Sequence, residues 1–132
     1  MPNLRQAMMG AAGVSTGPEG SLWSWGYNNN WGSLGDGTTI NRSSPVQIGS
    51  LTDWATPCGT QGRSNFCVKK DGTLWAWGGG ANGQLGLNST VDYSSPVQVG
   101  SLTDWHRVFG GGYFAIAVKT DGTLWSWGDG DG

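Results

Sequence analysis

The chain has 132 residues and a formal net charge of −2, with 25 Gly and 9 Trp but only 12% charged residues. The glycines follow no three-residue period, which excludes collagen, and the regularly spaced tryptophans exclude a disordered chain. Its few Lys and Arg residues are scattered, so no nucleic-acid surface is predicted. It has no long apolar run, so no transmembrane helix is predicted.

Residues 1–20 are predicted to form an N-terminal tether, either a short helix followed by a linker or an extended segment. The helix would cover residues 3–12 and place Leu4, Met8 and Ala11 on one face. A helix this short is marginal in water, so we expect these three side chains to anchor the rest of the chain to a larger assembly, or the terminus to fray. No continuous apolar region indicates a secretion signal.

Residues 21–132 are built from an internal repeat of about 50 residues, which is typical of stacked or circular repeat architectures. The hexapeptide SLWSWG at Ser21–Gly26 recurs with small changes at Thr73–Gly78 and Thr123–Gly128. The segment SSPVQIGSLTDW at Ser43–Trp54 recurs with one change at Ser94–Trp105. We therefore treat this region as one body of repeats.

Each repeat is predicted to contain four short strands. An Asp-Gly pair such as Asp71-Gly72 lies between two strand-like runs and predicts a hairpin in which the pair supplies positive φ angles. Pro45 and Pro96 are predicted to begin a further strand at a sheet edge, because proline lacks the N–H that pairs strands. A fourth strand is expected after each TDW motif.

These motifs resemble the repeat family of the regulator of chromosome condensation over roughly residues 21–128. The shared pattern is an apolar strand, Asp-Gly, an aliphatic-aromatic strand ending in Trp-Gly, a loop such as Gly83–Gly86 and a strand that begins with Pro. The resemblance implies an all-β fold of four-stranded propeller blades. The family usually has a His where this chain has Ser64 and Phe114.

The family's complete domain is a ring of seven blades, and this chain is too short to form one. We count two strands of one blade, one complete blade and three strands of another, or about two blades plus a partial one. Three explanations are open: the chain is a fragment, several copies form a ring, or the repeats lie against a different partner. Each implies association with other protein, because terminal repeats cannot bury their faces alone.

No catalytic, metal-binding or cofactor-binding residue is predicted, and we expect no enzyme activity. His106 is the only histidine, so no His-based metal cluster can form within one chain. The family's nucleotide-exchange activity depends on loops outside the repeat, and the resemblance does not carry it to this chain.

Aspartates recur at equivalent repeat positions, and we expect all of them to form turns and cap backbone groups. They are Asp53, Asp71, Asp104 and Asp121. Trp31 is the tryptophan without a counterpart in the other repeats, and it is the predicted exposed contact.

We expect a bacteriophage virion component, such as a tail fibre, tail-associated or capsid decoration protein, because the repeat is similar to bacterial and phage copies. Its partners would be other protein chains, in a homo-oligomer or virion assembly, and a host surface. The alternatives are a cellular protein-interaction module with a closed propeller, and a lectin-like protein that binds sugar. The predicted location is the virion or the cytoplasm, without nucleic acid or membrane.

Overall fold

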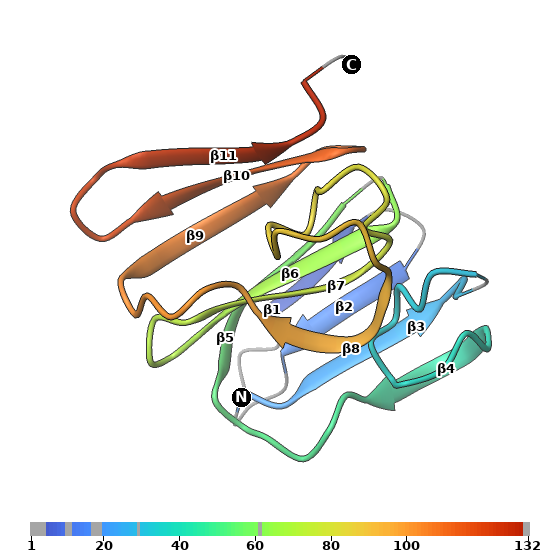
Figure 1. Ribbon diagram of the computed structural model, residues 1–132. Coiled ribbons are helices and arrows are strands. Elements are labelled where there is room, and N and C mark those ends of the chain that lie inside the picture. The colour runs from blue at the N-terminus through green and yellow to red at the C-terminus, as the bar shows by residue number, and fades with distance from the viewer. Residues whose placement is uncertain (1–4, 10–11, 17–19, 29, 61, 131–132) are drawn as a thin grey trace.

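The computed structural model describes residues 5–9, 12–16, 20–28, 30–60 and 62–130, which contain strands and turns but no helix. This part of the chain accordingly offers no helix that is long and apolar enough to cross a membrane. Three antiparallel sheets follow one another in chain order, and each packs against the next (Figure 1). We call them the first, second and third blades.

The strands of each blade are consecutive in the sequence. The first blade contains β1 (Arg5–Met9), β2 (Ala12–Thr16), β3 (Leu22–Gly26) and β4 (Arg42–Gln47). The second contains β5 (Trp54–Gly59), β6 (Ser64–Lys69), β7 (Leu74–Gly78) and β8 (Tyr93–Gln98). The third contains β9 (Trp105–Gly110), β10 (Phe114–Lys119) and β11 (Leu124–Gly128).

The three blades share one pairing register. The residue that opens the second strand of each blade pairs with the glycine that ends the Leu-Trp-x-Trp-Gly strand: Ala12 with Gly26, Ser64 with Gly78, and Phe114 with Gly128. The predicted all-β fold, with two blades and a partial one, is confirmed.

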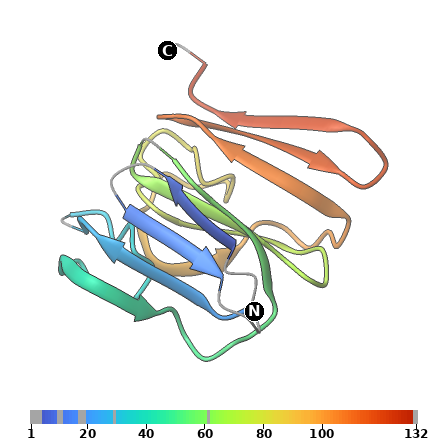
Figure 2. The ribbon, with the colours of Figure 1, turned by 180° about the vertical axis from the view of Figure 1, so that it is seen from behind.

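The N-terminal segment differs from the predicted helix. β1 and β2 pair with each other, β2 also pairs with β3, and together they complete the first blade, of which we had counted only two strands. Both lie beside β5 of the second blade, as the view from behind shows (Figure 2). Pairing to an existing sheet overrides the weak helical preference of a ten-residue segment. Met8 lies in β1, whereas Leu4 and Ala11 are outside the described residues.

The Asp-Gly hairpins form with a different turn from the predicted one. Gly72 has a φ of 82°, but Asp71 is not among the non-glycine residues with positive φ. The N–H of Gly72 donates to the carbonyl of Lys69 at 3.0 Å, and the N–H of Lys69 donates to the carbonyl of Thr73 at 2.9 Å. This is a turn whose last residue alone is left-handed, a longer hairpin loop than the two-residue type.

The proline-containing strands lie at sheet edges, as predicted. β4 and β8 are the last strands of the first and second blades. Pro45 and Pro96 are the fourth residues of these strands rather than the first, and a register irregularity in the pairing of each strand lies nearby. An edge strand tolerates proline because one side of it has no partner to receive an N–H.

The core consists of two apolar layers, one at each boundary between blades. Between the first and second blades, Leu22 and Ile48 pack against Trp54, Cys67 and Trp77.

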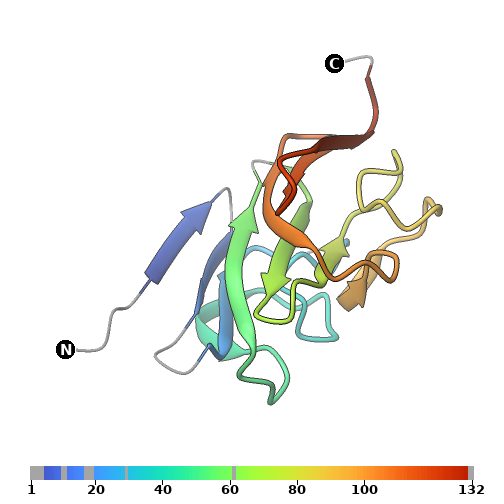
Figure 3. The same ribbon diagram turned by 90° about the vertical axis from the view of Figure 1, so that its left-hand side faces the viewer.

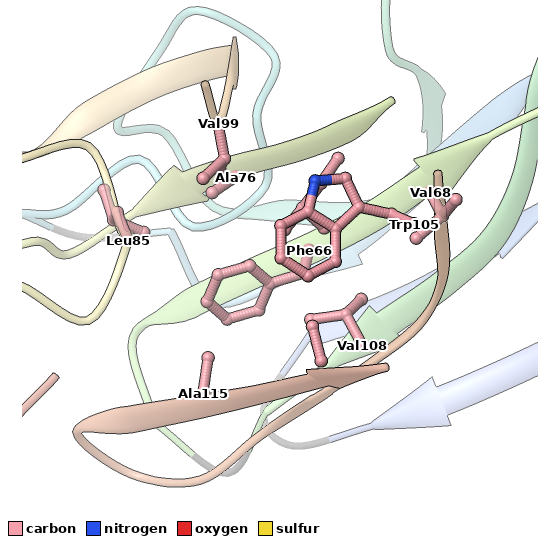
Figure 4. Packing of buried hydrophobic residues seen from close by; sticks show 10 residues of the cluster. Phe66, Val68, Ala76, Leu85, Val99, Trp105, Val108 and Ala115 are labelled. Carbon is pink, nitrogen blue, oxygen red and sulfur yellow. The ribbon is translucent and has the colours of Figure 1, made fainter. Parts of the chain in front are cut away.

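The second layer is larger, and Figure 4 shows Phe66 and Ala76 of the second blade near Trp105, Val108 and Ala115 of the third. The second blade therefore contributes one face to each layer, and the side view shows the blades arranged in series (Figure 3).

Candidate interaction surfaces

Each blade boundary is fastened by a tryptophan that hydrogen-bonds to a loop of the preceding blade. The indole N–H of Trp77 donates to the carbonyl of Ser33 at 3.0 Å, and that of Trp127 donates to the carbonyl of Gln84 at 2.8 Å. A Cβ placed on Gly35 or Gly86 would lie 2.7 Å from the indole nitrogen. The repeated glycine loop and the second tryptophan of each strand are thus two halves of one contact, which we call the indole lock.

A buried lysine lies between two tryptophans in the second and third blades. The Lys69 ammonium lies 4.6 Å from the ring centre of Trp54 and 4.2 Å from that of Trp75, and Lys119 repeats this arrangement. Asp53 Oδ2 is 3.6 Å from Lys69 Nζ, and Asp104 is the equivalent partner of Lys119. Rings and carboxylate together compensate the buried charge.

The four equivalent aspartates therefore divide into two roles. Asp71 and Asp121 act as predicted: each accepts hydrogen bonds from the N–H and hydroxyl of the threonine two residues later. The hydrogen bond from Thr73 lowers the pKa of Asp71 from its ordinary value. Asp53 and Asp104 do not cap turns with their side chains. Each lies close to its lysine because the strand after the TDW motif runs beside the strand that carries the lysine.

The third blade presents an open apolar face. Leu74 of the second blade is fully buried, whereas its counterpart Leu124 is 68% exposed. Phe114 and Phe109 on the same blade are 45% and 52% exposed. The third blade covers the corresponding face of the second, but nothing in the described part of the chain covers the third.

The third blade also has an open edge. β3 and β7 each pair with a proline-containing strand, but β11 ends the order β11-β10-β9 among the described residues. Its outer N–H and C=O groups therefore resemble the row that an added strand pairs with.

The residues singled out from the sequence do not gather into one site. Trp31 is half-buried, and the guanidinium carbon of Arg63 lies 3.9 Å from its ring centre. His106 is exposed on β9. Among the described residues, no three His, Cys, Asp or Glu side chains come together as a metal site would require.

Two four-stranded sheets and one three-stranded sheet, all antiparallel, stack face to face and are joined by the indole lock, which defines the described part of the chain as a run of β-propeller blades. The Regulator of chromosome condensation (RCC1) repeat matches residues 19–56 and 71–118. The chain therefore belongs to the RCC1 repeat family.

Two relatives from Arabidopsis thaliana match a large part of this chain. The ultraviolet-B receptor UVR8 is 34% identical over 88 residues, which are 64% of this chain and 19% of the receptor. The mitochondrial RCC1 domain-containing protein RUG3 is 33% identical over 92 residues, 69% of this chain and 20% of that protein. The chain thus spans about a fifth of each relative.

Solved structures show the same fold. Human WBSCR16 superposes with a TM-score of 0.78 at 22% identity, over 89% of this chain and 31% of that one. Yeast RCC1 (Prp20), crystallised with Kap60, superposes with a TM-score of 0.76 at 18% identity, over 94% of this chain and 29% of that one.

Proposed function

We propose that the chain is a non-enzymatic protein-interaction module whose third blade binds a further protein segment through its open face and edge. The observation that carries this proposal is the contrast between buried Leu74 and exposed Leu124 at equivalent repeat positions. A large apolar side chain on an exposed, regular sheet is typical of a protein-binding surface.

The surface suits a partner that contributes a strand or a sheet. A strand added to β11 would take the place that β4 and β8 take in the other blades, with main-chain hydrogen bonds providing affinity. Apolar side chains from the same partner would cover Phe114 and Leu124, as the third blade covers Leu74. The boundary between the second and third blades already shows which contacts such a face makes.

Solved relatives support protein partners for this fold. Yeast RCC1 (Prp20) was crystallised bound to Kap60, and the Prp20p structure from Saccharomyces cerevisiae was reported with its binding properties to Gsp1p and histones. Those partners are reported for that protein. We expect a partner of this chain to be recognised by the apolar face and the open edge of the third blade.

The virion role remains a prediction from the sequence. The relatives named above are plant, human and yeast proteins, and none is described as a phage component. The interaction role agrees better with them.

The test compares two exposed leucines. Leu124→Arg puts a charge on the open face, whereas Leu102→Arg changes a leucine that is 46% exposed in the linker before β9. Sedimentation velocity would measure the mass of each variant against the 13.9 kDa monomer. Affinity purification from the source cells, followed by reconstitution with the identified protein, would measure binding of a different chain.

We expect wild type and Leu102→Arg to form the same complex and Leu124→Arg to lose it. Unchanged complexes with Leu124→Arg would contradict the proposal. So would a wild-type chain that stays monomeric and retains no partner.

A further inference from the structure

A pocket of about 350 Å³ opens at the boundary between the first and second blades, away from the third-blade face. One wall comes from the end of β4 and the linker to β5, including Ile48 and Leu51. The other comes from Pro96 on β8. Its size falls within the range of ligand pockets, and residues of two blades line it.

The lining is mainly apolar. Ile48, Leu51, Pro96 and the rings of Trp54 and Trp75 all border the pocket. Leu51 is 50% exposed, although it is an aliphatic residue. A side chain entering the pocket would remove apolar surface from water on both sides of the contact, which stabilises binding.

One hydrogen-bond donor on the lining has no acceptor at hydrogen-bond distance among the described residues. The Lys69 ammonium borders the pocket and is 3.6 Å from Asp53 Oδ2, beyond ordinary hydrogen-bond distance. The indole N–H of Trp54 also lacks a partner among the described residues, but it is buried and not open to a ligand. A ligand that carries an acceptor would satisfy the ammonium that the blade leaves unmatched.

The charges around the pocket are already balanced. Lys69 faces Asp53, and Asp36 on the lining accepts from Arg42 Nε at 2.9 Å. An added carboxylate would be repelled by the two aspartates, and an added cation by the lysine. The balance therefore favours an uncharged acceptor, and a main-chain carbonyl is one.

The third blade provides an internal comparison. Lys119, Trp105 and Trp125 repeat the lysine and both tryptophans, and the indole N–H of Trp105 is likewise unpartnered. Leu87 occupies the position equivalent to Asp36, and the described residues provide no strand equivalent to β8. The third blade thus has the same lysine and tryptophans but lacks the wall that Pro96 supplies in the second.

We propose that the pocket between the first and second blades binds an aromatic or branched aliphatic side chain of a partner peptide, together with an adjacent main-chain carbonyl. This rests on the proposed role in protein binding but uses a different surface from the third-blade face. Loss of one site therefore leaves the other measurable.

The experiment uses the full chain labelled with ¹⁵N and titrated with N-acetyl-L-phenylalaninamide, an uncharged side chain between two carbonyl groups. The readout is the indole N–H resonance of each tryptophan. N-acetylglycinamide tests the need for the side chain, phenylacetate tests the effect of negative charge, and methyl glucoside tests a sugar as the alternative ligand.

Two pairs of variants locate the site. Leu51→Trp fills the pocket from an exposed position, and its matched control is Leu102→Trp at the equivalent position of the next linker. Lys69→Met removes the ammonium, and its matched control is Lys119→Met. Because Leu51 is half exposed, the first variant stays informative even where loss of a buried lysine disturbs folding.

We expect saturable shifts at Trp54 and Trp75 with N-acetyl-L-phenylalaninamide and weaker binding of the other three compounds. Leu51→Trp should abolish the shifts, and Lys69→Met should weaken binding about tenfold, the usual effect of losing a hydrogen bond to a charged donor. Both control variants should bind as wild type. No saturable shift, equal loss in the controls, or preference for methyl glucoside would overturn the proposal.

Discussion

The paired leucines of the second and third blades allow the open face to be measured in the chain itself. Leu74 is fully buried, so Leu74→Ala should lower the free energy of unfolding by about 3 kcal/mol, within the usual range for a core leucine. Leu124 is 68% exposed and buries about a third of its side chain, so Leu124→Ala should lower it by at most about 1 kcal/mol. The difference, about 2 kcal/mol, is the contribution of the missing cover.

Urea denaturation followed by tryptophan fluorescence would supply both values. The slope against urea should stay the same in the two variants, because each removes a side chain without changing the surface exposed on unfolding. Measurements at several protein concentrations would control for self-association. Equal destabilisation by the two substitutions would refute the reasoning, since it would mean that the third-blade face is already covered.

Two further predictions concern local contacts. Gly35→Ala should lower the free energy of unfolding by about 2 kcal/mol or more, because a left-handed backbone and a Cβ against Trp77 act together. Gly49 has a similar φ, but a Cβ placed on it would meet nothing within 4 Å. Gly49→Ala should therefore lower the free energy of unfolding only by the cost of the left-handed backbone. Equal losses in the two variants would exclude a steric role for the indole lock. Burial raises the pKa of Asp36, but hydrogen bonds from Thr38 and Arg42 outweigh it and hold the pKa below the ordinary 3.8. The stability that ionised Asp36 contributes is present above pH 3.8 and is lost as the pH falls through the pKa of the folded state. Asp36→Asn should therefore reduce the loss of free energy of unfolding at acid pH. An unchanged loss would contradict this.

Repeat spacing was sufficient to predict most of the fold. The Leu-Trp-x-Trp-Gly strand and the hairpin before it recur with little change, so one repeat predicts the others. The turn type could not be predicted from the sequence, because Asp-Gly occurs both in two-residue turns and in the longer loop that ends at Gly72.

The first two strands were missed because their sequence has diverged from the repeat. Small residues and methionines fit a short helix as well as a strand, and neither β1 nor β2 carries an aromatic residue. One signal was present: Glu19-Gly20 precedes Ser21-Leu22-Trp23 as Asp71-Gly72 precedes Thr73-Leu74-Trp75. Alignment on that pair would have extended the repeat to the N-terminus.

The candidate surfaces could not be predicted from the sequence and are visible only in the structure. Leu124 and Leu74 lie in nearly the same sequence context, and only the arrangement of blades shows that one is covered and the other is not. The pocket beside Lys69 similarly depends on β8, which approaches the end of β4 across a blade boundary. Sequence reasoning favoured Trp31 because it was unique, whereas the structure directs attention to positions that recur in different surroundings.

The indole lock gives the stack a direction. Every lock joins the indole of a later blade to the loop of an earlier one, so the two sides of a boundary are chemically different. Contacts of this kind cannot join two copies by a two-fold axis, which requires the same patch on both partners. Any assembly that continues the blade stacking must therefore be polar, growing head to tail as an arc or closing as a ring.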